Sequence, residues 1–487
     1  MNPPIRRTAF VLFGVFLLLL GMLSYVQVVA GPRYRDDPRN ARVALSRAGR
    51  ERGGIVTADG VVVAESVARA DDPRVYQRNY PEGARYAYPV GYTSLLFGDA
   101  GLERERAGIL TSGRNSTISA LLEVLGGGDL QAEGLRLTID DELQETAAAA
   151  LGGLPGAIVA LDPRTGAVLA VVSHPSFDPN LLVGNDAAEN GERLENDEGR
   201  PLLDRTIRET YPPGSIFKII TTAAALESGS VNTGTTFPDV AVMEFPDGGT
   251  LPNFDEELCA DGTEVTLATA FERSCNTVFA ALGMEIGAEA LVGTAEDFGF
   301  TAEVPYELDV LRSFIPGTAE LDPVAVAQSS IGQRDVRATP LLMALMAAAV
   351  ANDGVIMEPY LVGETFSADG EIVSRQETAP WRRAVSPATA RTLSELMERV
   401  VTSGTGTRAA VPGVRVAGKT GTAEVPTGPP HAWFVGFAPV DPDPGQRQIA
   451  FAVLVESGGD VGERATGGTV AAPIAAQLIE AWLAAGS

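Results

Sequence analysis

YPPGSIFK, residues 211–218, is the stretch from which the fold and the chemistry can be argued. Two prolines and a glycine break the chain before Ser215, and the apolar run IITTAAALESG after Lys218 is typical of a helix. Ser215 therefore falls at the start of a helix predicted over about residues 215–228, with Lys218 three positions later on the same face. Unpaired N–H groups at a helix start favour negative charge, and a neutral Lys can take a hydroxyl proton. The stretch predicts a serine nucleophile with a lysine base.

The two lysines of the chain are its most informative residues. Of 37 basic residues only Lys218 and Lys419 are lysine, and the rest are arginine. Arg stays protonated, whereas an ammonium group can be driven to lose its proton by burial or a second cation. A coding bias against Lys would leave two at random, and a Ser three positions before a Lys is a weak signal alone. The surroundings of Lys419 decide between these explanations.

Lys419 lies in VRVAGKTGTAE, which supports two interpretations. Residues 413–420 match the phosphate-binding pattern GxxxxGK[ST]. That pattern needs a helix starting at the Lys, but residues 414–416 are strand-like and the following GTAEVPTGPP excludes a helix. The alternative is that Lys-Thr-Gly-Thr forms a strand beside the nucleophile. It would then belong to a set of three sequence motifs that occur together, the others being S-x-x-K and S-x-N.

The S-x-N element has two candidates, Ser230-Val-Asn232 and Ser274-Cys-Asn276. If the helix of Ser215 continues, Ser230 lies about 22 Å along its axis at 1.5 Å per residue, too far to touch the nucleophile. Ser274 follows an intervening segment that can return to the cleft. The sequence therefore predicts Ser274 and Asn276 as the middle element.

Composition excludes several classes of function. A formal net charge of −26 argues against nucleic-acid binding, which depends on Lys and Arg. The chain has only two His, His174 and His431, so a Ser-His-Asp triad or a metal site has little to build from, and we expect no metal and no cofactor. Cys259 and Cys275 form either one disulfide, contributing about 3 kcal/mol, or two buried thiols.

One segment is long enough to cross a membrane. Residues 9–30, AFVLFGVFLLLLGMLSYVQVVA, carry no charge, and Arg6 and Arg7 precede them. The positive-inside tendency predicts a short cytoplasmic N-terminus at 1–8, a single crossing at 9–30 and an exported remainder. A cleaved signal peptide is the alternative. No other segment approaches spanning length, and residues 341–351 are predicted to form a buried helix.

The exported part divides into a non-catalytic region at 31–152 and a catalytic region at 153–487. The first contains short strand signals, including a hairpin around Asp59-Gly60, a strand at 135–139 and a helix capped by Asp140 or Asp141. The second predicts an α/β (α+β) fold in which an antiparallel sheet is built from both ends of the region. Its strands are expected at 158–161, 167–172, 413–418, 433–437 and 449–455, and its helices at 215–228, 265–283, 338–352, 387–402 and 470–484.

The sequence as a whole is similar to class B penicillin-binding proteins, and most of all to the actinobacterial penicillin-binding protein A type. The three motifs carry the resemblance most specifically, and Arg334-Asp335 departs from it because many relatives have Gly there. Further similar stretches are RGGIVTADG (52–60), GLER (101–104), LTID (137–140), ALDPRTGAVLA (160–170), SFDPNLL (176–182), IGQ and ATPLLMA (331–344), GTGT (404–407) and WFVGFAP (433–439).

This resemblance implies a β-lactamase-like transpeptidase domain with helices on both sides of its sheet, preceded by an elongated, mostly β domain of the pedestal or dimerisation type. It implies a peptidoglycan D,D-transpeptidase that cross-links stem peptides through an acyl-enzyme and is acylated by β-lactams. The roles implied for single residues are nucleophile for Ser215, base for Lys218, proton relay for Ser274, a hold on the substrate amide for Asn276, positive potential for Lys419, and substrate binding for Thr420, Gly421 and Thr422. Backbone N–H groups of Ser215 and Thr422 would form the oxyanion hole.

Two other functions remain open at this point. A D,D-carboxypeptidase or β-lactamase-like hydrolase uses the same motifs, and a non-catalytic cell-wall scaffold would use residues 31–152 to bind other proteins. The expected partners are stem peptides, β-lactams, the cytoplasmic membrane and proteins of the division or elongation machinery.

Overall fold

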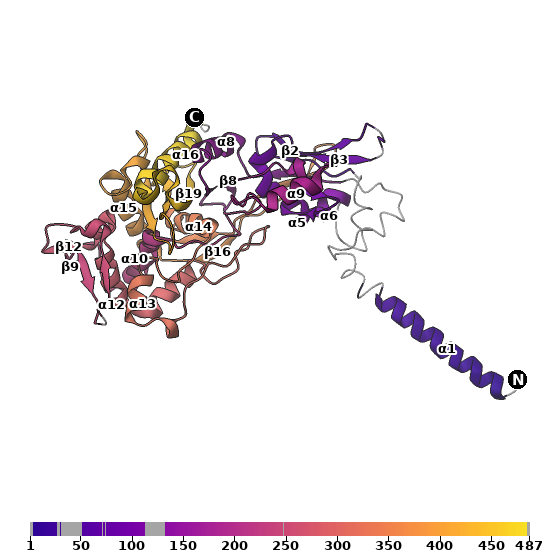
Figure 1. The fold of residues 1–487 in the computed structure, drawn as a ribbon, viewed down its shortest axis with the longest axis horizontal. Coiled ribbons are helices and arrows are strands. Elements are labelled where there is room, and N and C mark those ends of the chain that lie inside the picture. Colours follow the sequence, from indigo (N-terminus) through magenta and orange to yellow (C-terminus); the bar gives the residue numbers. More distant parts are fainter. Residues whose placement is uncertain are drawn as a thin grey trace.

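The structure is a computed structural model that describes residues 3–26, 30, 51–70, 72–73, 75–112, 132–246 and 248–484. Figure 1 shows helix α1 (Pro3–Ser24) at the N-terminal end, followed by a smaller body of strands and short helices and a larger body that contains the C-terminus.

Helix α1 begins earlier than the predicted start at residue 9. Its first residue is Pro3, and proline is favoured in the first turn because its φ is already helical and its missing N–H would be unpaired there. Residues 4–24 are apolar enough to cross a membrane and lie fully outside the core. The predicted end of the crossing, residues 27–29, lies outside the described residues, while residue 30 is described.

Five strands form the central sheet of the larger body, in the order β17-β18-β19-β7-β8. All neighbours are antiparallel; Lys419 faces Val435, and Val435 faces Ala452. Segments from both ends of the region are therefore hydrogen-bonded neighbours, which confirms the predicted antiparallel sheet. The strands are β7 (Gly156–Leu161), β8 (Val168–His174), β17 (Ala417–Ala423), β18 (His431–Ala438) and β19 (Ile449–Val455).

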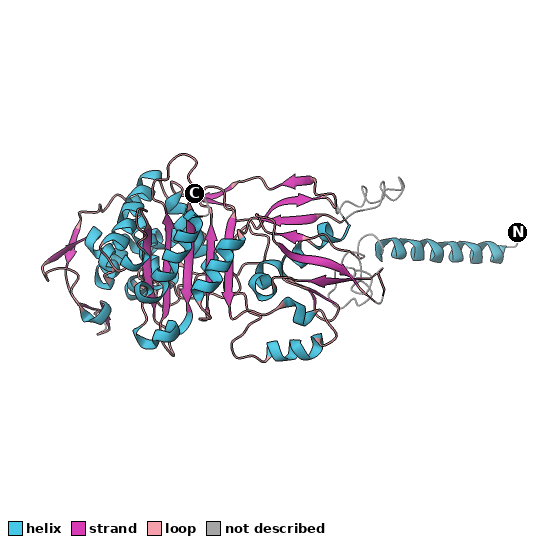
Figure 2. Cartoon of the chain, turned by 90° about the horizontal axis from the view of Figure 1, so that it is seen from above, coloured by secondary structure: helices cyan, strands magenta, loops and turns pink. Residues whose placement is uncertain are grey.

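Helices cover both faces of this sheet, as Figures 1 and 2 show. Along β19, Phe451 and Val453 enter one core cluster, whereas Ala452 and Leu454 enter the other, because successive side chains of a strand point to opposite faces. Burial on both sides explains why the strand IAFAVLV has no polar alternation. The covering helices are α8 (Asp141–Leu151) and α16 (Ala472–Ala484) on one face and α14 (Pro340–Ala351) on the other.

A second group of helices packs beside the β17 edge and carries the predicted motifs. The helix predicted over 265–283 is wrong as a single element, because the chain breaks at Ser274, which has a left-handed φ of 64°. The group consists of α10 (Lys218–Glu227), α11 (Leu267–Arg273), α12 (Asn276–Asp297), α13 (Pro323–Ser329) and α15 (Pro387–Thr402).

Helix α12 also corrects the expectation that only one segment reaches spanning length. It is long and apolar enough by composition, but it packs against α10 and α13 and buries residues such as Phe279 and Leu282 in the core. We therefore assign α12 to the interior of the larger body, and not to a membrane.

The smaller body is built on a six-stranded sheet in the order β15-β14-β6-β1-β2-β3. The predicted hairpin around Asp59-Gly60 is confirmed, since β1 and β2 pair antiparallel. Strands β14 and β15 come from residues 362–375, more than 200 positions after β6, yet β14 pairs with β6. The strands are β1 (Ile55–Val56), β2 (Val62–Ala68), β3 (Tyr76–Asn79), β6 (Gly134–Leu137), β14 (Val362–Phe366) and β15 (Ile372–Arg375).

Shorter elements complete the described chain. Four helices lie around the six-stranded sheet: α4 (Ala87–Val90), α5 (Gly101–Glu105), α6 (Ala107–Ser112) and α9 (Ala187–Glu195). Paired short strands are β4 (Thr93–Ser94) with β5 (Gly98–Asp99), β9 (Thr236–Pro238) with β12 (Glu264–Thr266), β10 (Val242–Glu244) with β11 (Thr250–Pro252), and β13 (Val355–Met357) with β16 (Pro380–Arg383).

Candidate active site

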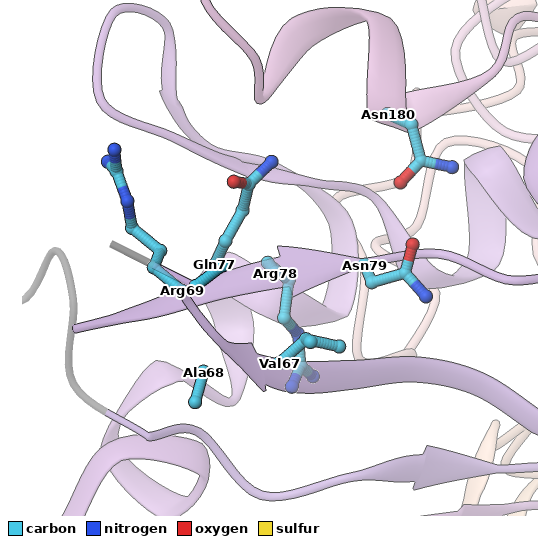
Figure 3. A pocket seen from close by; sticks show the side chains of 8 residues that line it. Val67, Ala68, Arg69, Gln77, Arg78, Asn79 and Asn180 are labelled. Atoms are coloured by element: carbon cyan, nitrogen blue, oxygen red, sulfur yellow. The ribbon is translucent and has the colours of Figure 1, made fainter. Parts of the chain in front are cut away.

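Cavity volume alone does not locate the chemistry. A surface cavity of about 550 Å³ lies at β2 and β3 in the smaller body, where Gln77, Asn79 and Asn180 line it (Figure 3). It contains neither Ser215 nor a lysine. The candidate site is instead recognised by the buried cations at the β17 edge of the central sheet.

Ser215 lies in a single 3₁₀ turn, η4 (Gly214–Phe217), that runs directly into α10. Residues i and i+3 eclipse one another in a 3₁₀ turn, so Ser215 and Lys218 share one face, as the sequence predicted. Gly214 has φ +55°, and a Cβ there would lie 2.8 Å from the carbonyl oxygen of Thr422. Glycine therefore lets the nucleophile turn approach strand β17 closely.

Lys218 is fully buried, and its Nζ forms hydrogen bonds to oxygen atoms. Nζ donates to the Ser274 carbonyl oxygen (2.6 Å), to Asn276 Oδ1 (2.8 Å) and to Ser274 Oγ (3.3 Å). Burial lowers the pKa of Lys218 well below its usual value, and the charge of Lys419 lowers this pKa further. The carbonyl and amide oxygens only accept hydrogen bonds, so a neutral Lys218 amine gives them its two N–H bonds. Its lone pair is then left for the third contact, the Ser274 hydroxyl.

Lys419 is also fully buried, within strand β17. Its Nζ donates to Ser274 Oγ (2.9 Å) and to the Thr420 carbonyl oxygen (3.1 Å). Burial lowers the pKa of Lys419 to about 7. Because Lys419 lies in mid-strand with no helix starting there, the structure contradicts the phosphate-binding pattern. The strand itself begins at residue 417, so the predicted strand at 413–418 was placed too early.

Ser274 lies between the two ammonium groups. It ends α11 in a left-handed conformation, which turns both its carbonyl and its hydroxyl toward Lys218. A hydroxyl has two acceptor lone pairs and one proton, so Ser274 accepts from both lysines or passes a proton between them. The other candidate, Ser230, bonds instead to Ser228 beyond the far end of α10. The structure thus brings Ser274 to the lysines and leaves Ser230 outside.

The remaining predicted residues line the β17 edge or face it. Asn276 is held at both ends, since its Nδ2 donates to the Pro252 carbonyl oxygen (2.9 Å) while Oδ1 accepts from Lys218. The Thr420 hydroxyl pairs with that of Thr405 (2.5 Å). A Cβ at Gly421 would lie 2.8 Å from Ile216 Cγ1, so only glycine lets β17 pass the nucleophile turn this closely. Thr422, opposite Gly214, is half-buried.

Residues 156–480 match the family described as penicillin binding protein transpeptidase domain, about two thirds of the chain. The chain belongs to the penicillin-binding protein family. Residues 52–134 match the penicillin binding protein A dimerisation domain. Both matched segments are penicillin-binding protein modules, and together they contain every predicted site residue and most of the smaller body.

Named penicillin-binding proteins resemble this chain along their full length. The peptidoglycan D,D-transpeptidase PbpA of Mycolicibacterium smegmatis is 42% identical over 505 aligned residues, covering 100% of both chains, and that of Mycobacterium tuberculosis is 40% identical, covering 99% of both. The solved structure of penicillin-binding protein A from M. tuberculosis as a ceftriaxone acyl-enzyme complex has a TM-score of 0.83 and 39% identity, covering 90% of this chain and 99% of that one. Its penicillin G acyl-enzyme complex has a TM-score of 0.81.

The departure from the penicillin-binding protein pattern at Arg334 has a backbone explanation. Arg334 has φ +60°, a left-handed conformation that glycine adopts without strain. Its guanidinium lies 3.4 Å from the carboxylate of neighbouring Asp335 in an exposed loop. The loop thus has the backbone conformation that glycine favours, although a charged residue occupies the position.

A disulfide joins Cys259 to Cys275, with Cα atoms 6.2 Å apart. Cys275 separates Ser274 from Asn276, so the disulfide fastens the loop of Cys259 to the middle motif of this penicillin-binding protein. The structure thus favours the disulfide over two free thiols.

Several residues of the site escape sequence reasoning. Phe279 and Phe271 place their rings 5.4 Å and 5.7 Å from Lys218 Nζ and Lys419 Nζ, which stabilises each cation in a buried position. Thr405 contacts Thr420 from a distant loop, and its only signal was membership of the GTGT run. An aromatic residue in an apolar helix gives no sign in sequence that it covers a catalytic cation.

Proposed function

We propose that this protein is a membrane-anchored peptidoglycan D,D-transpeptidase that works through an acyl-enzyme on Ser215 and is acylated there by β-lactams. The observation that carries the proposal is the fully buried Lys218 amine, whose partners are acceptor oxygens and whose pKa is lowered by burial and by Lys419. A lysine held in this way is ready to take a proton at neutral pH.

Acylation begins when Ser215 Oγ adds to the carbonyl carbon of a D-Ala-D-Ala amide and its proton moves to Lys218 Nζ. The amide C–N bond then breaks, and the leaving amine takes a proton through the Ser274 hydroxyl, which contacts both lysines. An amine of a second stem peptide attacks the resulting ester and restores the Ser215 hydroxyl. Every proton removed from a nucleophile thus has an acceptor within the Lys218–Ser274–Lys419 network.

Strand β17 supplies the substrate contacts in this proposal. It is the edge strand of the sheet, so its outer N–H and C=O groups are available to a peptide that lies alongside it. Backbone N–H groups of Ser215 and Thr422 form the oxyanion hole. Thr420, Gly421 and Thr422 bind the substrate terminus, Lys419 supplies positive potential for its carboxylate, and Asn276 holds the substrate amide.

Membrane attachment and domain roles complete the proposal. Helix α1 anchors the chain with its N-terminus in the cytoplasm, since Arg6 and Arg7 lie near the N-terminal end of the helix, and the larger body is extracytoplasmic. Residues 31–152 form the non-catalytic region and residues 153–487 the transpeptidase region. In this proposal the non-catalytic region also binds proteins of the division or elongation machinery.

Intact-protein mass spectrometry tests the assignment of the nucleophile. The exported fragment incubated with penicillin G should gain one adduct, which Ser215→Ala should lack. Lys218→Arg should form the adduct on the order of a hundredfold more slowly, because a guanidinium cannot serve as base. An adduct on the Ser215→Ala protein would show that the nucleophile lies elsewhere.

A further inference from the structure

The side chain of Asn253 lies where three segments of the chain meet next to the active site. Its Nδ2 donates to the carbonyl oxygens of Val240 (3.0 Å) and Glu257 (3.0 Å). Its Oδ1 accepts from the backbone N–H of Thr277 (3.1 Å) and from the Thr277 hydroxyl (3.2 Å). This amide, only 5% exposed, therefore connects the segments of Val240, Glu257 and Thr277 through both its donor and its acceptor groups.

These bonds fix strand β11 against the start of α12. Thr277 is in the first turn of α12, directly after Asn276. Pro252, directly before Asn253, ends β11, and its carbonyl oxygen accepts from Asn276 Nδ2. The Asn253 side chain therefore ties the end of β11 to the first turn of α12, next to the contact between the Pro252 carbonyl and Asn276.

The Pro252 carbonyl decides which way the Asn276 amide points. A carbonyl oxygen only accepts, so Asn276 must turn its NH₂ toward Pro252, and its Oδ1 then faces Lys218 Nζ at 2.8 Å. Oδ1 and the Ser274 carbonyl take two N–H bonds, and the third position on Nζ faces the Ser274 hydroxyl at 3.3 Å.

We propose that Asn253 is a positioning residue for acylation, which acts through the Pro252 carbonyl and the Asn276 amide to hold the Lys218 amine in its orientation beside the Ser274 hydroxyl. This inference rests on the proposed function, in which Lys218 is the base. Asn253 itself touches neither lysine nor substrate, and no sequence motif of the site includes it.

The loop that contains Asn253 is fastened by other contacts, so its replacement leaves the fold in place. The carboxylate of Asp239 accepts from the backbone N–H groups of Cys259, Ala260 and Gly262 at 2.8 Å each. Cys259 is also joined to Cys275 by the disulfide. Replacing the amide therefore loosens the Pro252–Asn276 contact while the loop stays attached.

Acylation by penicillin G, followed by intact-protein mass spectrometry over a range of pH, tests the inference on two variants. Asn253→Ala removes all hydrogen bonds of the side chain, whereas Asn253→Asp keeps the acceptor for Thr277 and replaces only the donors with a carboxylate oxygen. In both variants, the plateau rate of acylation should fall on the order of tenfold, because small misplacements of catalytic groups slow a reaction by factors of this size. The acid limb of the profile should move to lower pH, because a loosened Asn276 Oδ1 stabilises the Lys218 ammonium form less and so lowers the pKa of that amine.

Asn180→Ala is the matched control. Asn180 also joins distant backbone segments, donating to the Tyr80 carbonyl oxygen (2.8 Å) and accepting from the Tyr80 N–H (3.0 Å), but it lies in the smaller body. It should lower the melting temperature without changing the acylation profile.

Two outcomes would overturn the inference. An acid limb that moves to higher pH in the Asn253 variants would mean that water entry, and not amide orientation, changes Lys218. Equal loss of rate from Asn253→Ala in wild-type and Asn276→Ala backgrounds would show that Asn253 does not act through Asn276. In either case the wild-type adduct and its absence in Ser215→Ala would remain, so the proposed function would stand.

Discussion

The two buried lysines lower the folding stability of the protein and supply the reactive amines of its active site. Lys419 is fully buried with its pKa lowered to about 7, from an ordinary value of 10.5. Between these pH values the unfolded chain binds a proton that the folded chain does not, so folding stability rises with pH across this window. At neutral pH the protein therefore keeps a destabilising group where its chemistry requires it.

Lys419→Met should raise the melting temperature at pH 7, because methionine fills the same volume without burying an amine. The same substitution should abolish acylation, because the active site loses that amine. The gain should shrink toward about pH 11, above the ordinary pKa of 10.5, where Lys419 is neutral in both the folded and the unfolded state. Thermal unfolding of wild type and variant at both pH values measures it. A Met variant less stable than wild type at pH 7 would contradict this account.

Sequence predicted those residues of the site that local spacing connects. Ser215 and Lys218 are three positions apart, and helical periodicity alone places them together. Phe271, Phe279 and Asn253 reach the lysines or their partners only through tertiary packing. Nothing in the local sequence distinguishes these residues from ordinary core or loop residues.

At the scale of elements, the active site forms where two interruptions of helical structure lie against strand β17. The turn η4 approaches β17 because glycine occupies positions 214 and 421, and the break between α11 and α12 presents Ser274. Helix α15 occurs at Pro387–Thr402, as predicted, because Ser386 caps it and its apolar face is regular. The break at Ser274 was missed because LATAFERSCNTVFAAL contains no proline or glycine.

The disulfide should contribute to stability through the loop that it closes, 16 positions long. The double variant Cys259→Ser/Cys275→Ser should lose about 3 kcal/mol in free energy of unfolding in urea. Because the chain has only two cysteines, alkylation of the denatured protein should add two labels after reduction and none before. Labels on unreduced protein would mean that the thiols are free.

At the scale of the whole molecule, the smaller body depends on a segment of the larger region. Strand β14 pairs with β6 along Val362–Phe366, and β6 in turn pairs with β1, so three separate segments share one sheet. Sequence predicted strands at β1 and β6 but not this partnership, because the pairing of strands more than 200 residues apart leaves no local pattern.

Truncation tests this shared sheet. A fragment of residues 51–487 should be monodisperse and acylated at the wild-type rate. A fragment of residues 138–487 keeps α8 but lacks β6 and leaves an edge of β14 unpaired, so it should unfold at a lower temperature and self-associate on size-exclusion chromatography. Equal melting temperatures for the two fragments would contradict the dependence.

The scarcity of lysine gives the protein a built-in spectroscopic probe. Because Lys218 and Lys419 are its only lysines and both are fully buried, lysine labelled with ¹⁵N or ¹³C would yield two side-chain resonances, each from one side of Ser274. Amine-reactive reagents would meet no lysine on the surface of the folded part of the chain that the structure describes. Isotope-labelled lysine would thus report protonation and β-lactam binding in the intact enzyme without any substitution.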